Sequence, residues 1–300
     1  MSITIYATEE PQDWRQHVAQ AFDAVKRVED LTTSFSDSSD IGQVNVNAGR
    51  NYYPVDDEVL EIVRQAQEIS KLSHGAFDIT ILPLLRLWRF KSAHPRVPNQ
   101  AEISAKRALV GYNKIDIKGN EIQLPERGMG LDLGGIAKGY AVDRAAELLR
   151  AFGYEDFLID AGGDLRAFAG PLTRGRRTIW VRHPRTREGF FAKIKMDSGA
   201  VATSGDYERY FEIDGKRYHH VLDPATGSPG RPAVSVTIFA PTTARADAVA
   251  TAVFVLGPQQ GMAFIEKDSD LEGLIIFEKD SNLQWTVSQG IANKLNILEP

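Results

Sequence analysis

The 300-residue chain contains no cysteine. Disulfide bridges, thiolate zinc sites, a lipobox and a cysteine nucleophile are therefore excluded. Neither sign of charge is in clear excess, because 35 Lys and Arg stand against 40 Asp and Glu, for a formal net charge of −5. Nucleic-acid-binding proteins usually carry a basic face, and we therefore expect no nucleic-acid partner.

The densest basic segment alternates with turn residues and with the strand-like residues Ile179 and Val181. This alternation is typical of a solvated hairpin. Its arginines are Arg174, Arg176, Arg177, Arg182, Arg185 and Arg187.

The chain also lacks recognisable targeting segments. Residues 1–11 do not combine a basic start with an apolar stretch, which predicts no export signal. We find no run that approaches the length of a transmembrane helix. We expect a cytoplasmic protein, although a chain from which an export signal had been removed would look the same.

What the chain does contain is the composition of a globular protein, with 43% apolar and 25% charged residues. Its length allows a substantial core, and no linker divides it. We expect residues 1–300 to form one domain, or two intimately packed subdomains.

Hydrophobic periodicity predicts helices separated by paired strands. The predicted helices cover 14–35, 57–72, 78–88, 136–152, 243–256 and 258–267, and the polar stretch 36–49 is predicted to be a loop. The strands arrive mostly as hairpins, at 115–124, 157–169, 177–195, 207–221 and 274–287. This order favours an α+β fold with mainly antiparallel sheets flanked by helices.

Three segments carry residues suited to a nucleotide and a cation. At 131–143 a strand ends at Gly134 and Gly135 and a helix begins, so free amides, the helix dipole and Lys138 could bind a phosphate. At 160–164, Gly162 and Gly163 permit a tight turn or a close approach to a ligand, and Asp164 follows them. Either glycine turn could equally serve packing alone.

The third segment is the helix that follows Thr243. Asp247 and Thr251 are four residues apart and share a face, where a carboxylate and a hydroxyl form a hard oxygen pair suited to Mg²⁺ or Ca²⁺. An aspartate near a helix start often only complements the dipole. Here small apolar neighbours indicate burial, and a buried charge requires a partner.

Two further segments supply polar and aromatic groups. Thr203 and Ser204 offer hydroxyls before a turn, and His219 and His220 occupy adjacent strand positions that face opposite sides. Phe77 could stack on a flat ring and Asp78 could accept hydrogen bonds from a ligand. Core packing, helix capping and a structural histidine are the alternatives.

These segments occur together and in order, as GAFDIT (75–80), LDLGGIAKGYAVD (131–143), DAGGD (160–164), VATSGDYERY (201–210), HHVLDPATG (219–227) and TTARADAVATAVFVLG (242–257). Over about residues 35–257 the chain resembles the FAD:protein FMN transferase (ApbE) family. The resemblance implies a T-fold-like structure with FAD, the substrate, in an elongated cleft. It also implies transfer of FMN to a Thr or Ser hydroxyl of an acceptor flavoprotein, with release of AMP.

The resemblance further implies site residues. Mg²⁺ would be bound by the backbone carbonyl of Ala137 and the side chains of Asp247 and Thr251. Lys138 and His220 would be catalytic, with His220 orienting or deprotonating the acceptor hydroxyl. The residues that match positions lining FAD are Phe77, Asp78, Lys138, Gly162, Gly163, Asp164, Thr203 and Gly205.

One departure leaves alternatives open. Residues 36–45 keep only fragments of a Ser-Glu-Leu-x-x-Leu-Asn pattern that is common in the family, so the contacts of that loop are in doubt. A metal-dependent FAD pyrophosphatase and a non-catalytic FAD-binding protein remain alternatives to the transferase.

Overall fold

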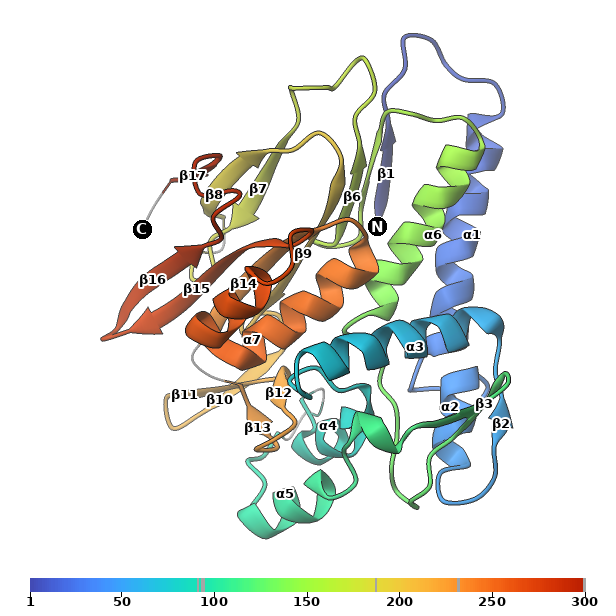
Figure 1. Ribbon diagram of the computed structural model, residues 1–300, viewed down its shortest axis with the longest axis vertical. Coiled ribbons are helices and arrows are strands. Elements are labelled where there is room, and N and C mark those ends of the chain that lie inside the picture. The colour runs from blue at the N-terminus through green and yellow to red at the C-terminus, as the bar shows by residue number, and fades with distance from the viewer. Residues whose placement is uncertain (91, 93–94, 187, 231–232, 299–300) are drawn as a thin grey trace.

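The computed structural model describes residues 1–90, 92, 95–186, 188–230 and 233–298, so Arg187 of the basic segment lies outside the described residues. Among them, seven strands form one sheet in the order β1-β5-β6-β9-β14-β15-β16 (Figure 1). These strands are β1 (Ser2–Ile5), β5 (Phe157–Asp160), β6 (Leu165–Phe168), β9 (Gly199–Gly205), β14 (Ala233–Ala240), β15 (Glu272–Lys279) and β16 (Asn282–Val287).

Three helices cover this sheet, and two of them carry the predicted cation ligands and Lys138. They are α1 (Trp14–Thr32), α6 (Ala137–Ala151) and α7 (Thr243–Ile265). α6 packs between α1 and α7, and α7 lies across β9, β14 and β15 (Figure 1). All eight residues of β14 are buried beneath it. The largest core cluster runs from Val28 to Ile275 and joins these helices to the sheet.

α7 is bent at Gly257, whose φ of 75° and ψ of −179° interrupt the helix just before Pro258. The two helices predicted at 243–256 and 258–267 meet at this bend. By length and composition α7 could span a membrane, which corrects our statement that no run approaches that length. Its apolar face is used here to cover β9 and β14.

Smaller elements surround this unit. The helices are α2 (Asp40–Val46), α3 (Asp57–Leu72), η1 (Ile79–Ile81), α4 (Leu82–Trp88), α5 (Gln100–Arg107) and η2 (Tyr112–Lys114). The strands are β2 (Tyr53–Pro54), β3 (Asp116–Lys118), β4 (Glu121–Gln123), β7 (Thr178–Arg182), β8 (Phe190–Lys195), β10 (Tyr210–Ile213), β11 (Lys216–His219), β12 (Leu222–Asp223), β13 (Ser228–Pro229) and β17 (Leu295–Ile297). They form the sheets β17-β8-β7 and β2-β4-β3 and the hairpins β10-β11 and β12-β13.

Every strand pair described is antiparallel, which confirms the predicted fold class. The hairpin predicted at 207–221 turns at Asp214 and Gly215, which both have positive φ, as a type I′ turn requires. The predicted loop at 36–49 is wrong in part, because it contains α2.

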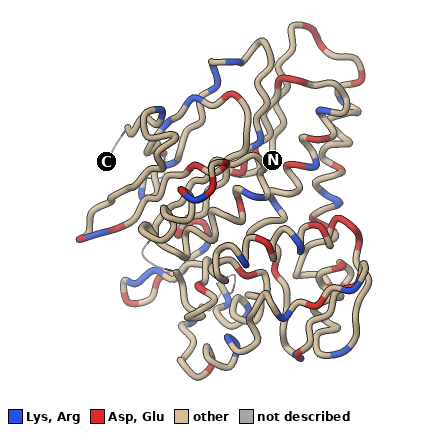
Figure 2. Tube along the Cα trace, viewed as in Figure 1, with Lys and Arg blue, Asp and Glu red and all other residues tan. Residues whose placement is uncertain are grey.

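The basic segment forms the predicted hairpin β7-β8, but it is not solvated throughout. Arg177 is buried, and its guanidinium lies 3.2 Å from the carboxylate of Asp156. Elsewhere Lys and Arg alternate with Asp and Glu along the trace (Figure 2).

Candidate functional site

The centre of the candidate site is the close approach of α6 to α7. A Cβ atom on Gly139 would lie 2.4 Å from the carbonyl oxygen of Thr243, so only glycine allows the two helices to pack this tightly. One turn further along α7, Oδ2 of Asp247 accepts a hydrogen bond from the amide of Gly139 (3.3 Å). The start of α6, with Ala137 and Lys138, therefore faces Asp247.

The turn between β5 and β6 brings a second carboxylate to this point. Gly162 and Gly163 have φ of 71° and 103°, and open space lies where their Cβ atoms would be. The amide of Gly163 donates to Oδ1 of Asp160 (3.0 Å), which closes the turn. Asp164 then points inward, and its Oδ2 lies 3.2 Å from Nζ of Lys138.

The two carboxylates perturb each other's titration. Burial raises the pKa of Asp164 to about 6, although Lys138 opposes the shift. For Asp247, burial and then the charge of Asp164 raise the pKa well above the ordinary aspartate range. Burial lowers the pKa of Lys138, but Asp164 and Asp247 outweigh this effect and leave it raised, so the ammonium stays charged. Two buried carboxylates this close favour a bound cation or a shared proton.

The face of α7 that carries Asp247 also carries Thr251. The hydroxyl of Thr251 forms a 3.2 Å hydrogen bond with the hydroxyl of Ser204 on β9. A Cβ on Gly135 would lie 3.3 Å from Oγ1 of Thr251, so the glycine pair before α6 reaches the same place. Thr203 points to the other face of β9, where its hydroxyl meets Thr237 (2.9 Å).

The adjacent histidines have different surroundings. His219 ends β11, is buried, and donates from Nε2 to the carbonyl oxygen of Gly230 (2.9 Å). His220 lies just beyond the strand, contrary to its predicted strand position. Burial, then Arg209 and His219, lowers the pKa of His220 to about 4, so the ring is neutral near pH 7. Its Nδ1 is buried without a hydrogen-bond partner among the described residues.

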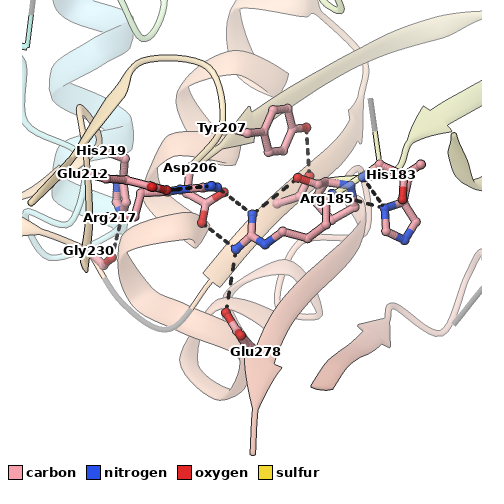
Figure 3. Close-up of polar contacts among 12 residues, drawn as sticks. His183, Arg185, Asp206, Tyr207, Glu212, Arg217, His219, Gly230 and Glu278 are labelled. Carbon is pink, nitrogen blue, oxygen red and sulfur yellow. Dashed lines mark hydrogen bonds and ion pairs between the residues drawn. The ribbon is translucent and has the colours of Figure 1, made fainter. Parts of the chain in front are cut away.

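Residues 205–209 are held in place by a charged cluster (Figure 3). Arg185 lies in the loop between β7 and β8, and its Nη1 and Nη2 donate to the carboxylate of Asp206 (2.7 and 2.8 Å). Arg217 lies 3.6 Å from the same carboxylate. The ring of Tyr207 covers Gly205, where a Cβ would lie 2.5 Å from it. The side chain of Glu208 contributes a negative charge that favours protonated Lys138.

Phe77 and Asp78 adopt the structural arrangements that were their alternatives. Phe77 is buried, with its ring edge 3.1 Å from the Cβ position of Gly135. Asp78 caps η1, accepting from the amide and hydroxyl of Thr80 (2.8 and 2.6 Å) and from the amide of Tyr112 (2.8 Å). Burial raises its pKa, and these hydrogen bonds oppose the shift.

Two cavities lie away from these residues. The larger, of about 490 Å³, is lined by the end of α3 and the second half of α7, including His74 and Lys267. The other, of about 320 Å³, includes Arg150 and Arg174. Within the described ranges no cluster of three His, Asp or Glu side chains could hold a metal ion. Any cation here would depend on two carboxylates supplemented by hydroxyl and carbonyl oxygens.

Comparison with known proteins decides the family. The model of the ApbE family matches residues 1–275. The chain belongs to the ApbE family. The resemblance drawn from the six motifs is thereby confirmed.

Individual members of the ApbE family are similar along most of the chain. The FAD:protein FMN transferase of Klebsiella pneumoniae (strain 342) is 34% identical over 262 residues, covering 86% of this chain and 81% of that protein. The FAD:protein FMN transferase of Treponema pallidum is 30% identical, covering 99% of this chain and 86% of that protein. Their names agree with the predicted enzyme class.

Solved structures of ApbE proteins share the fold. The ApbE protein of Thermotoga maritima has a TM-score of 0.87 and 32% identity, covering 97% of this chain and 95% of that one. The flavin transferase ApbE of Vibrio cholerae has a TM-score of 0.87 and 29% identity, covering 97% and 94%.

Sequence reasoning assigned no site role to three residues that the structure places in or beside the candidate site. Asp143 is a buried aspartate inside α6 with small and apolar neighbours, the same signal that singled out Asp247. Ser204, rather than Thr203, is the β9 hydroxyl that meets Thr251. The close approach at Gly139 was visible only as a glycine within a predicted helix, which by itself indicates nothing about its partner.

Proposed function

We propose that this protein transfers FMN from FAD to a Thr or Ser hydroxyl of an acceptor flavoprotein, with Mg²⁺ bound and AMP released. The observation that carries the proposal is the convergence of Lys138, Asp164, Asp247 and Thr251 beside the start of α6, in a chain of the ApbE family.

The donor atoms fit a hard cation. Oδ2 of Asp164 is buried and accepts no hydrogen bond of good geometry from the described residues, apart from its ion pair with Lys138. With Asp247, the hydroxyl of Thr251 and the carbonyl of Ala137, the available ligands are all oxygen atoms, which Mg²⁺ prefers. Asp247, Thr251 and Ala137 would hold the ion, which when bound neutralises pyrophosphate charge as a Lewis acid.

The chain's own residues would position the pyrophosphate. Lys138 is charged and half exposed, so it can contact a phosphate oxygen while remaining paired with Asp164. The amides of Ile136, Ala137, Gly139 and Gly163 already donate within the protein, to Leu133, Asp247 and Asp160. Those of Gly135 and Lys138 would supply further donors. These groups stabilise charge that develops as the phosphorus–oxygen bond to AMP breaks.

His220 would prepare the acceptor. The acceptor oxygen forms a new bond to the phosphorus of the FMN half, AMP leaves with the bridging oxygen, and the hydroxyl proton needs a base. His220 is neutral at assay pH and can accept a hydrogen bond from that hydroxyl. With a pKa of about 4 it takes the proton only as the new bond to phosphorus forms.

The test is FAD turnover by purified protein with Mg²⁺ or EDTA, with and without a peptide that contains an acceptor threonine. We expect AMP release and peptide-bound flavin only when Mg²⁺ and peptide are both present. Asp247→Asn should abolish both, and Asp156→Asn, at a buried aspartate outside the site, should not. Acceptor-independent AMP release would instead indicate a pyrophosphatase, and FAD binding without AMP release a non-catalytic protein.

A further inference from the structure

Asp143 bridges α6 and α7 but belongs to none of the groups assigned above. It lies inside α6 and is buried. Its Oδ1 accepts from the amide of Thr243 (2.9 Å) and its Oδ2 from the amide of Ala244 (2.8 Å). These are the first amides of α7, which have no partner within their own helix. A side chain of one helix therefore caps the other.

The two interhelix contacts are one turn apart on both helices. Gly139 and Asp143 are separated by four residues on α6, as are Thr243 and Asp247 on α7. Asp143 meets the start of α7, and Gly139 meets Asp247. Because residues four apart share a helix face, these contacts together define both the register and the separation of the helices.

A third element is tied to the same junction. Arg166 on β6 places its Nε 3.8 Å from Oδ1 of Asp143 and donates to the carbonyl oxygen of Pro241, just before α7. Arg166 follows by two residues Asp164, which precedes the first residue of β6. The strand that follows Asp164 is therefore tied to α6 through a partly buried ion pair and to the residue before α7 through the carbonyl of Pro241.

We propose that Asp143 is a positioning residue, which holds the start of α7 against α6 so that Asp247 and Asp164 lie where a divalent cation can bind. This inference rests on the proposed function, in which Asp247 is a ligand of the cation. A residue of this kind acts through the geometry of the ligands and contacts neither the cation nor FAD.

The decisive variant is Asp143→Asn, which keeps the shape of the side chain. An amide nitrogen cannot accept the hydrogen bond of a backbone amide, so one end of the bridge becomes repulsive. Removing a group that orients metal ligands typically weakens metal affinity about 10- to 100-fold, and we expect a loss in that range.

The matched control is Asp156→Asn. Asp156 is also buried, accepts a backbone amide (Thr173, 3.0 Å) and pairs with an arginine (Arg177, 3.2 Å). Its partners lie at 173–177 and not on α6 or α7. A purely structural effect of losing a buried carboxylate would appear equally in both variants.

The measurement is binding of Mn²⁺, as a probe for Mg²⁺, followed by the electron paramagnetic resonance signal of the free ion in the presence of FAD and without acceptor. We expect the wild type and Asp156→Asn to bind alike, Asp143→Asn to bind about tenfold more weakly or worse, and Asp247→Ala to lose the site. If Asp143→Asn binds as tightly as the wild type while Asp247→Ala does not, the inference is overturned and the proposed function stands. If Asp247→Ala also binds like the wild type, the proposed cation site itself is wrong.

A second measurement needs no variant and covers the case in which Asp143→Asn fails to fold. Coupling between two sites is reciprocal, so cation binding must strengthen the contact between Asp143 and α7. We expect Mn²⁺ with FAD to slow hydrogen exchange at the amides of Thr243 and Ala244, together with Gly139. Protection at Gly139 with unchanged exchange at Thr243 and Ala244 would overturn the inference.

Discussion

At the scale of single residues, His220 shows how its surroundings select a protonation state. Burial disfavours the charged imidazolium, and the neighbouring Arg209 and then His219 add to that effect, so that the pKa of His220 falls to about 4. The amide of His220 donates to the carbonyl of Arg209 (3.0 Å), which keeps the ring beside this arginine. The imidazole is thus available as a base without first losing a proton.

This state makes folding sensitive to acid. An unfolded histidine titrates near 6.5, so between that pH and about 4 only the unfolded chain binds the proton. The stability that neutral His220 contributes is complete above its pKa in the unfolded chain. It is lost as the pH falls through its pKa in the folded protein. As the pH falls from about 7.5 to about 4.5, the free energy of unfolding of the wild type should decrease by roughly 2 kcal/mol more than that of His220→Gln.

Urea unfolding of both proteins across that range would measure the difference. A difference that does not change with pH would mean that the folded protein accepts the proton as readily as the unfolded chain.

The candidate residues that the sequence suggested are those that carry their own local signal. Asp247 and Thr251 share a helix face. The structure brings Asp247 to the start of α6 and Thr251 to β9. Asp143 has a signal of the same kind, but its role depends on two amides a hundred residues away. Such a pairing is a property of helix packing and cannot be read from the spacing of residues along one helix.

At the scale of secondary-structure elements, the bend in α7 determines which part of the helix reaches the site. The first half carries Asp247 and Thr251 against β9 and β14. At Gly257 the backbone enters a region that is essentially restricted to glycine. Pro258 then begins the second half, so the chain changes direction without disturbing the ligand-bearing turns.

The bend predicts a specific cost for a methyl group. Gly257→Ala should lower the free energy of unfolding by about 1–3 kcal/mol, because alanine is strained in this region. Gly153, with φ of 88° and open space at its Cβ position, is the control. Its replacement by alanine should cost only about 1 kcal/mol. Denaturant unfolding measures both, and an equal or smaller loss at Gly257 would refute this explanation of the bend.

Two short helices, α2 and α5, were not predicted from the sequence pattern. α2 was predicted to be loop because its neighbourhood is rich in Ser, Asp and Asn, yet Ile41 and Val44 are buried in the main core. Burial of two side chains outweighs weak propensity over so few residues. α5 was missed although Asn99 and Glu102 form a capping box, since Ile103 is its only buried residue. In α5 the capping signal was present in the sequence, but the hydrophobic periodicity of a helix was not.

At the scale of the whole molecule, one core joins elements from both ends of the chain. It includes Val28 of α1, Ile122 of β4, Val249 of α7 and Ile275 of β15. The candidate site takes residues from α6, α7, the β5–β6 turn and β9, all of which contact this core or the sheet above it. A cation and FAD bound there would therefore bridge the same elements that the core already joins.

This arrangement predicts one cooperative unfolding transition for residues 1–300 in calorimetry, not two. Ligands that bind only the folded state stabilise it by about 2.7 kcal/mol at a hundredfold excess over Kd, which corresponds to a rise in Tm of about 5 °C for a chain of this size. Mg²⁺ and FAD together should raise the single Tm more than either alone, because each completes the other's site, and Asp247→Asn should remove the contribution of Mg²⁺. Two transitions, of which only one moves with ligand, would instead show two subdomains that unfold separately, with the site confined to one of them.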